Sequence, residues 1–240
     1  MESNSGMTDQ TMQENRALIA FWDKAFASSE GDQVQEQDPD DWKALAPSLK
    51  LFRAALSLGQ RKKVLDFGCG NAWAGIIAAK GGCTDVTAVD AAPGAVRAAR
   101  LNAAHFGVTD RVHIDHASPE WLQSSISGTY DGLFCSNVLD VIPPETAEIM
   151  IREFARIMAP DACMIVGLNY YLSPETAAAK GIDLKDGNRL YMDGVLRLVS
   201  RSDEEWARIF SRWYRIEWLE HFAWPEEGAE TRRLFFLRNR

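Results

Sequence analysis

The chain has 240 residues, a formal net charge of −8, 46% hydrophobic residues and 25% charged residues. This composition is typical of a globular protein and allows one large α/β domain, or a core with a small appendage. Nucleic-acid backbones require a positive surface, and no long basic run is present, so we expect no nucleic-acid partner. No apolar stretch approaches the ~20 residues that cross a bilayer. With a polar N-terminus that is unlike a signal peptide, the sequence predicts a cytoplasmic protein without membrane attachment.

The four cysteines are far apart and form no CxxC pair. Each lies in or beside an apolar segment, at Cys69, Cys83, Cys135 and Cys163. This usage favours free, buried thiols in a reducing compartment over a zinc site or disulfides.

Two helical segments are expected before the first strand. The first begins at Thr8 and places Leu18 and Trp22 on one face. A polar break over residues 28–41 separates it from a shorter second helix, which Pro47 is expected to kink or split. These segments are placed to cover the open edge of the core, so we interpret them as a helical N-terminal lid.

From residue 62 onward, apolar runs alternate with helical patterns. Five strands are expected, at 64–67, 86–89, 112–114, 130–135 and 164–168. The helices between them include 71–80, a segment with Pro93 in its first turn and Gly107 at its C-terminal cap, and 144–158. Strands separated by helices pair in parallel through right-handed crossovers, which predicts a doubly wound sheet.

The tail has a different character. Ser202 and Glu205 form a possible capping box for a short helix. Residues 215–222 and 232–237 then read as two strands joined by a Pro-Glu-Glu-Gly turn, which suggests an antiparallel hairpin that closes the sheet. The predicted fold is therefore α/β, doubly wound and mostly parallel. We expect a lid at 1–60 and a nucleoside-binding domain at 61–240.

The strongest motif follows the first strand. Gly68 and Gly70 end that strand and open a helix, where glycines allow close approach of a ligand to backbone N–H groups. A dinucleotide fingerprint requires a third glycine at position 73, but Trp73 stands there and would obstruct a pyrophosphate. Asp66, two residues before Gly68, also favours a cationic ligand over an anionic one.

A second carboxylate lies 20 residues after Gly70. Asp90 ends the second strand, where a carboxylate can accept both hydroxyls of a ribose. After the third strand, His116 and Ala117 occupy the place where the edge of an adenine would lie. Together these positions predict a nucleoside site.

Residues 62–170 resemble the class I S-adenosylmethionine-dependent methyltransferases. The stretch 64–71 is similar to their first motif, Asp90 to the acidic residue of their second, and 130–143 to their fourth. The resemblance implies a seven-stranded sheet whose last strand is inserted antiparallel, and S-adenosylmethionine as cofactor. It implies cofactor contacts from these residues: Trp22, Asp66, Gly68, Cys69, Gly70, Trp73, Asp90, Ala91, His116, Ala117 and Ser136. In this chain His116 stands where the family usually has an Asp.

The reaction side of the site is expected beyond the fourth and fifth strands. Asn137 follows the fourth strand, and Tyr170 and Tyr171 follow the fifth, so we assign these three as candidate catalytic residues. Aromatic faces favour a cationic sulfonium, and alignment with exclusion of water supplies much of the barrier reduction in methyl transfer. No general base is evident, and His221, in an alternating strand pattern, reads as structural. No carboxylate cluster suggests a metal.

Three functions are compatible with this pattern. The favoured one is methyl transfer to a small-molecule acceptor, since the chain is acidic and lacks a separate recognition domain. The alternative is a cyclase in which the amine of S-adenosylmethionine attacks its own side chain, giving azetidine-2-carboxylate and methylthioadenosine. A non-catalytic S-adenosylmethionine sensor is the third, which the intact first motif disfavours. The acceptor, its attacking atom and the oligomeric state are left open.

Overall fold

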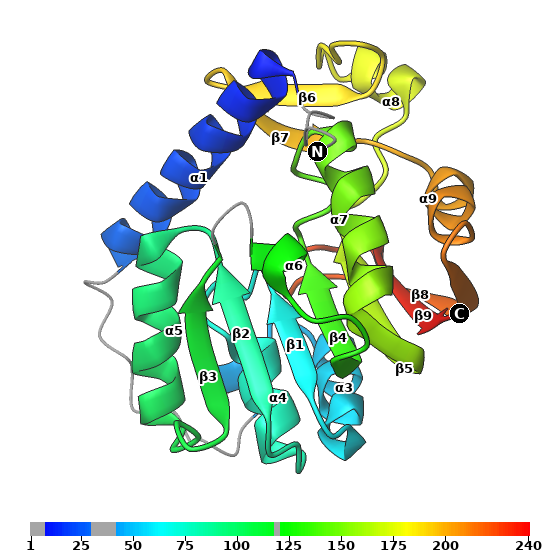
Figure 1. Ribbon diagram of the computed structural model, residues 1–240. Helices are drawn as coiled ribbons and strands as arrows, with labels where there is room; N and C mark the ends of the chain where they lie inside the picture. The colour runs from blue at the N-terminus through cyan, green and yellow to red at the C-terminus, as the bar shows by residue number, and fades with distance from the viewer. Residues whose placement is uncertain (1–7, 30–41, 118–120) are drawn as a thin grey trace.

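A seven-stranded sheet in the order β3-β2-β1-β4-β5-β9-β8 forms the centre of the protein (Figure 1). The structure is a computed structural model and describes residues 8–29, 42–117 and 121–240. Its first five strands in chain order pair in parallel: β1 (Val64–Phe67), β2 (Val86–Asp90), β3 (Val112–His116), β4 (Tyr130–Ser136) and β5 (Met158–Leu168). Two antiparallel strands complete the sheet, β8 (Tyr214–Phe222) and β9 (Arg232–Asn239). The α/β class, the doubly wound sheet and the C-terminal hairpin are confirmed.

Helices cover both faces of the sheet. One apolar cluster holds α3 (Leu49–Ser57), α4 (Trp73–Lys80) and α5 (Pro93–His105) against one face. A second cluster holds α6 (Trp121–Ser124), α7 (Pro144–Ile157) and α9 (Asp203–Phe210) against the other. Burial on both sides explains why β1 is apolar at three of its four positions, Asp66 being the exception.

The N-terminal helices divide into two roles. Helix α1 (Asp9–Ser29) packs on α5 and on β7 (Val195–Val199), and Figure 1 shows it crossing above the carboxyl ends of the parallel strands. The second segment is split around Pro47, as expected, into α2 (Trp42–Leu45) and α3. Because α3 is part of the core, only α1 among the described elements before residue 60 lies in the lid position. A domain boundary near residue 60 stays a prediction.

One region was not assigned secondary structure from the sequence. After β5 the chain forms α8 (Pro174–Ala179) and a separate two-stranded sheet of β6 (Arg189–Met192) and β7. Asp193 and Gly194 turn this hairpin with φ values of 51° and 77°. An Asp-Gly pair with two positive φ angles is the signature of a tight hairpin turn, so the signal was present in the sequence.

Several element ends differ from the sequence analysis by a few residues. The helix after the glycine motif begins at Trp73, two residues later than expected, because Ala72 is left-handed with φ 61°. The fifth strand begins at Met158, six residues earlier than expected.

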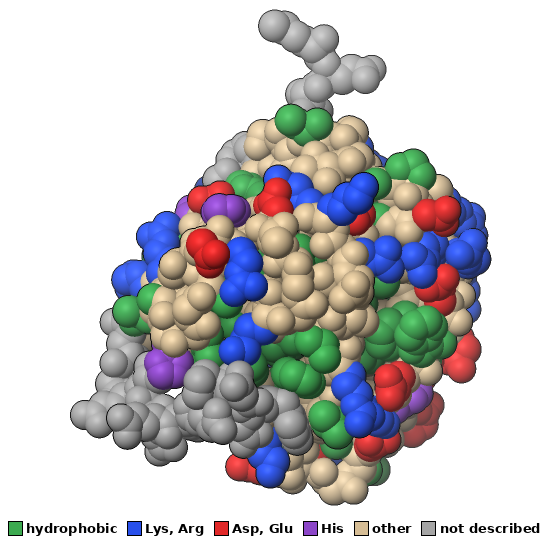
Figure 2. Space-filling view, turned by 90° about the horizontal axis from the view of Figure 1, so that it is seen from below, with side chains coloured by type: hydrophobic (Ala, Val, Ile, Leu, Met, Phe, Trp, Pro, Cys, Tyr) green, Lys and Arg blue, Asp and Glu red, His purple; other side chains and the backbone are tan. Residues whose placement is uncertain are grey.

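All four cysteines are buried and free. In the described part of the chain, no helix is both long enough and apolar enough to span a membrane. The face at the amino ends of the strands carries interspersed acidic and basic side chains (Figure 2).

Candidate active site

The loop between β1 and α4 is held in a tight, left-handed conformation. Gly68 and Gly70 have φ values of 67° and 55°. The amides of Gly68 and Cys69 both donate hydrogen bonds to the Val89 carbonyl, at 2.9 and 3.0 Å, which fixes the loop against β2. A Cβ atom on Gly68 would lie 2.3 Å from Cγ2 of Val138, so no larger residue fits there. The loop therefore presents bare backbone at the carboxyl edge of the sheet.

Asp90 connects this loop to the start of α5. Its Oδ2 accepts a hydrogen bond from the Gly70 amide and its Oδ1 accepts one from the Ala92 amide, each at 2.9 Å. Burial raises the pKa of Asp90, while these backbone donors and the nearby His116 lower it. A carboxylate has about four lone-pair sites, so each oxygen can accept a further bond from a ligand hydroxyl.

The adenosine end of the expected site is assembled around Asp90. Nε2 of His116 lies 3.0 Å from the Ala91 carbonyl oxygen. The Ala117 amide donates to the Asp90 carbonyl at 2.9 Å, and the Ala117 side chain is buried. The structure thus brings Asp90, Ala91, His116 and Ala117 together at the ends of β2 and β3.

Asp66 and Trp73 lie at the beginning of α4. The Asp66 carboxylate is buried and its Oδ2 accepts a 2.8 Å hydrogen bond from the Gly75 amide. Burial, aided by repulsion from Asp90, raises the pKa of Asp66 to about 7, against the opposing effect of the Gly75 donor. Trp73 packs edge-on against Phe134, with ring centroids 5.2 Å apart. The contacts of both residues are to the protein core, and their roles toward a cofactor stay predictions.

Cys69 lies within the loop itself. Its side chain is buried, and burial raises the pKa of the thiol well above the ordinary value, with Asp66 and Asp90 adding to the effect. The thiol is therefore protonated at neutral pH and unsuited to act as a nucleophile.

The end of β4 carries a strained residue and an unpaired acceptor. Asn137 is left-handed, with φ 55°, and its amide donates a 2.9 Å hydrogen bond to the Gly167 carbonyl. Its side-chain Oδ1 is buried and has no hydrogen-bond partner among the described residues. Ser136, the preceding residue, packs closely on Gly167. A Cβ atom added to Gly167 would lie 2.3 Å from Oγ of Ser136. Backbone strain with an unpaired acceptor is common at functional sites.

Helix α1 closes over the glycine loop. Phe26 approaches Gly70 so closely that a Cβ there would lie 3.2 Å from its Cζ. Trp22 contacts Phe21 edge-on at 5.3 Å and Phe26 at 6.3 Å between ring centroids. The Arg197 guanidinium of β7 lies 4.0 Å from the ring centroid of Phe21. Helix α1 is thus tied to the β6–β7 hairpin.

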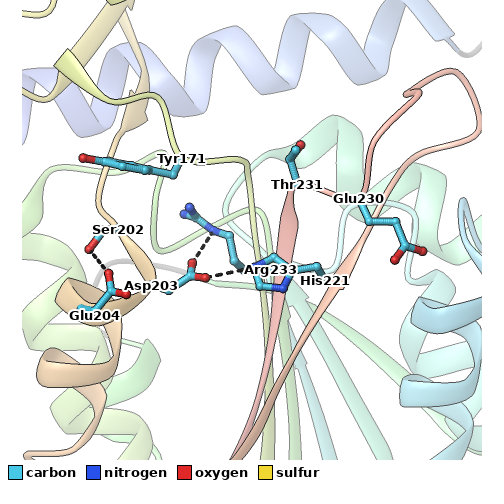
Figure 3. A pocket seen from close by; sticks show the side chains of 8 residues that line it. All are labelled: Tyr171, Ser202, Asp203, Glu204, His221, Glu230, Thr231 and Arg233. Atoms are coloured by element: carbon cyan, nitrogen blue, oxygen red, sulfur yellow. Dashed lines mark hydrogen bonds and ion pairs between the residues drawn. The ribbon is translucent and has the colours of Figure 1, made fainter. Parts of the chain in front are cut away.

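The two tyrosines after β5 lie at the surface. Tyr170 is 38% exposed and Tyr171 is 43% exposed. Tyr171 lines a cavity of about 420 Å³ formed by the ends of β5, β8 and β9 and the start of α9 (Figure 3). The other residues that line it are Ser202, Asp203, Glu204, His221, Glu230, Thr231 and Arg233.

Sequence reasoning missed most of this cavity. Arg233 lies on the same face of β9 as Phe235 and Leu237, which are buried in the core. A charged residue at an inward position of a strand is unusual, and that signal was available. His221, for which the sequence predicts a structural role, is bonded through Nε2 to Oδ2 of Asp203 at 2.9 Å. Its side chain is 42% exposed and also lines the cavity, and its role stays a prediction.

Comparison with known proteins supports the resemblance found in the sequence. Residues 64–161 match a family described as methyltransferase domain. Over this part of the chain, the match confirms the resemblance to the class I S-adenosylmethionine-dependent methyltransferases. It is 36% identical over 100 residues to a ubiquinone biosynthesis O-methyltransferase of Xanthomonas oryzae pv. oryzae, covering 41% of this chain and 39% of the relative. It is 33% identical over 144 residues to a ribosomal protein L11 methyltransferase of Cupriavidus pinatubonensis, covering 60% and 41%.

Solved structures show the same fold along the whole chain. A Burkholderia thailandensis 1,6-didemethyltoxoflavin-N1-methyltransferase, with bound 1,6-didemethyltoxoflavin and S-adenosylhomocysteine, has a TM-score of 0.67 at 17% identity, covering 99% of this chain and 93% of that one. A Mesorhizobium loti S-adenosylmethionine-dependent methyltransferase has a TM-score of 0.61 at 16% identity, covering 81% and 98%. The chain spans less than two thirds of the length of the curated relatives it matches.

The residues of this site fit S-adenosylmethionine, the cofactor that the sequence predicts. The Gly68–Gly70 loop is left-handed and bears no side chains at its two glycines, Asp90 retains acceptor capacity for a ribose, and the buried Oδ1 of Asn137 lacks a donor among the described residues. A cationic amino group can supply that donor. The expected cofactor and the seven-stranded sheet are confirmed, whereas the contacts of each residue stay predictions. Among the described residues, no three His, Cys, Asp or Glu side chains gather as metal ligands.

Proposed function

We propose that this protein transfers the methyl group of S-adenosylmethionine to a small-molecule acceptor. The observation that carries the proposal is that the glycine loop and the cavity lie along one edge of the sheet. The glycine loop and Asp90 follow β1 and β2, and the 420 Å³ cavity lies beyond β5 at the same edge. This volume is within the range of small-molecule sites.

Each side of the site has a distinct task in this proposal. S-adenosylmethionine supplies an electrophilic methyl group on a cationic sulfur. Asp90 accepts the ribose hydroxyls while it holds the Gly70 and Ala92 amides, so the ligand and the loop are fixed by one carboxylate. Asn137 accepts a hydrogen bond from the amino group. Phe26 and Trp22 of α1 cover the loop and exclude water, which favours alignment of the reacting atoms.

The small size of the acceptor is the finer part of the proposal. The two relatives named above include one whose name refers to a small molecule and one whose name refers to a ribosomal protein. A cavity of this volume with a buried arginine in its wall favours the first class over an extended protein surface.

Product analysis tests this function. The purified protein is incubated with S-adenosylmethionine alone, and then with a panel of small hydroxylated, aminated and heterocyclic compounds, with bacterial ribosomes as a macromolecular control. Mass spectrometry identifies the nucleoside product. We expect S-adenosylhomocysteine only when a small acceptor is present. Turnover with ribosomes alone would overturn the small-molecule assignment.

The same assay addresses the cyclase alternative. Internal attack needs no second substrate and releases methylthioadenosine, because a different carbon–sulfur bond breaks. Rapid, enzyme-dependent formation of methylthioadenosine without an acceptor would overturn the proposed methyl transfer and identify cyclisation as the reaction. Absence of both products with every compound, together with binding of S-adenosylmethionine, would favour a sensor.

A further inference from the structure

The cavity beyond Tyr171 contains a buried cation. Arg233 lies near the start of β9, pairs with Leu168 of β5 on one side and with His221 of β8 on the other, and is 1% exposed. Figure 3 shows its guanidinium pointing between Asp203 and Tyr171. The side chain therefore reaches from the core toward the cavity.

The guanidinium has no hydrogen-bond partner among the described residues. This holds for Nε, Nη1 and Nη2 of Arg233. The nearest carboxylate atom recorded is Oδ1 of Asp203, 3.8 Å from Nε, which is an ion-pair distance but too long for a hydrogen bond. A buried donor without an acceptor costs free energy, and more so when it is charged. A protein that retains such a group at a cavity wall commonly uses it to bind a ligand.

The other charged side chains of the cavity are already engaged. Asp203 accepts from His221 at 2.9 Å. Glu230 is paired with Lys50 at 2.7 Å, and Glu204 accepts from the Ser202 hydroxyl at 2.8 Å. Among the described residues that line the cavity, Arg233 is therefore the charged donor that remains available to a ligand. Their planar fork matches the geometry of a carboxylate, which accepts two parallel N–H bonds.

A nearby buried carboxyl balances the cation without bonding to it. Asp140 is fully buried, accepts a hydrogen bond from the Asn169 amide through Oδ2, and has no partner for Oδ1 among the described residues. Burial lowers the pKa of Arg233, and the charges of Asp140 and Asp203 oppose that shift. An arginine guanidinium is not deprotonated in proteins, so it stays a cation while its N–H groups stay available.

We propose that Arg233 binds a carboxylate of the methyl acceptor in this cavity, so that the substrates of this enzyme are small carboxylic acids. The proposal rests on the proposed function and deepens it. Tyr171 forms an aromatic wall of the same cavity, which suits an acid with a planar or apolar body. Arg233 would set the orientation of the acceptor at the β5 side of the cofactor loop.

Calorimetry with two matched probes tests the inference on the full chain. With saturating S-adenosylhomocysteine present, benzoate and benzamide are titrated separately; they share one shape and differ in charge. We expect benzoate to bind at least about tenfold more tightly than benzamide, because a charge-assisted, bidentate pair is lost in the amide. In Arg233→Gln this preference should disappear. Arg238→Gln is the matched control, since Arg238 lies on the same strand and is bonded to Glu217.

The experiment separates this inference from the proposed function. Equal affinity for both probes, no binding of benzoate, or an unchanged preference in Arg233→Gln would overturn the carboxylate assignment. S-adenosylhomocysteine binding, titrated first, reports on the cofactor site independently. If Arg233→Gln does not fold, a crystal structure of the wild-type protein with benzoate decides the question. The carboxylate is expected on the guanidinium, and benzoate bound elsewhere would refute the assignment.

Discussion

Asp23 of α1 caps helix α5 from outside: its Oδ1 accepts a 2.6 Å hydrogen bond from the Gly94 amide, across 71 residues of chain. The residue at the N-cap of α5 is Ala92, which offers no side-chain acceptor. The Asp23 carbonyl oxygen lies 2.9 Å from the position of a Cβ on Gly94, so the two helices meet where a side chain has no room. Docking of the lid and formation of the first turn of α5, directly after Asp90, are therefore coupled.

Removing this external cap should loosen the lid. Asp23→Ala is expected to lower the free energy of unfolding by about 1 kcal/mol, the usual cost of losing an N-cap acceptor. It should also speed amide hydrogen exchange along α1 more than elsewhere. Chemical denaturation and exchange mass spectrometry measure the two effects. Lys24→Ala, at an exposed neighbouring position, is the control, and equal exchange in the two variants would contradict the coupling.

A lid that closes over the ligand should also respond to it. We expect S-adenosylhomocysteine to slow hydrogen exchange in α1, with less protection in Asp23→Ala. Most of the polar break that the sequence predicts at residues 28–41 lies outside the described residues. Identical exchange of α1 with and without ligand would show that this helix is fixed and not a lid.

The glycine loop allows a matched test of steric fit. Gly68 and Gly107 have φ values of 67° and 66°, but a Cβ on Gly68 would lie 2.3 Å from Val138, whereas nothing lies within 4 Å of one on Gly107. Both alanine variants carry the same backbone strain, of order 1 kcal/mol. Only Gly68→Ala must also displace Val138. We expect its affinity for S-adenosylhomocysteine to fall at least tenfold, with Gly107→Ala near wild type. Similar affinities in calorimetry would remove the loop from the site.

Asp90 is expected to contribute directly to cofactor affinity. Asp90→Ala should weaken S-adenosylhomocysteine binding by about 1.5–3 kcal/mol, the range for hydrogen bonds to a charged group. Part of the loss will come from the Gly70 and Ala92 amides, which lose their acceptor. Asp85→Ala, just before the other end of β2, controls for a change of charge. If the two variants bind equally well, Asp90 does not hold the ribose.

Tyr171 distinguishes a reacting site from a binding surface. Because this ring lines the cavity proposed for the acceptor, Tyr171→Ala should lower kcat/KM for the acceptor while the Kd of S-adenosylhomocysteine stays within about twofold. Tyr170→Ala provides a comparison at the adjacent, similarly exposed tyrosine. A Tyr171 variant with unchanged turnover would place the ring outside the reaction.

Asp66 predicts an unusual dependence of stability on pH. Burial raises its pKa from 3.8 to about 7, so between these values the folded protein retains a proton that the unfolded chain has released. The unfolded state then binds fewer protons, and the free energy of unfolding falls as pH rises, by up to about 1.4 kcal/mol per unit for this group. In Asp66→Asn, the free energy of unfolding should not show this fall as the pH rises from 4.5 to 7. Urea denaturation across this range measures it. Asp110→Asn, whose side chain is 75% exposed, should behave like wild type, and a parallel slope in Asp66→Asn would contradict the assignment.

The sequence predicted the parallel strands and the glycine loop better than the cavity beyond β5, for a physical reason. A parallel strand such as Val64–Phe67 is buried on both faces, and its signal is local, as is that of Gly68 and Pro93. The cavity is built by residues from β8, β9 and α9, whose side chains meet only through antiparallel pairing. Arg233 next to His221 is a matter of strand register, which no local pattern determines.

The antiparallel insertion of β9 has a consequence for biosynthesis. Strand β5 is complete once residue 168 has been made, but its second neighbour is β9, which begins at residue 232. During translation the centre of the future sheet therefore stays an open edge while 63 further residues emerge. Open edges of apolar strands recruit other chains. The nascent chain passes through a period in which β5 is its most association-prone segment, and slow translation of residues 169–231 should increase aggregation while leaving the finished protein unchanged.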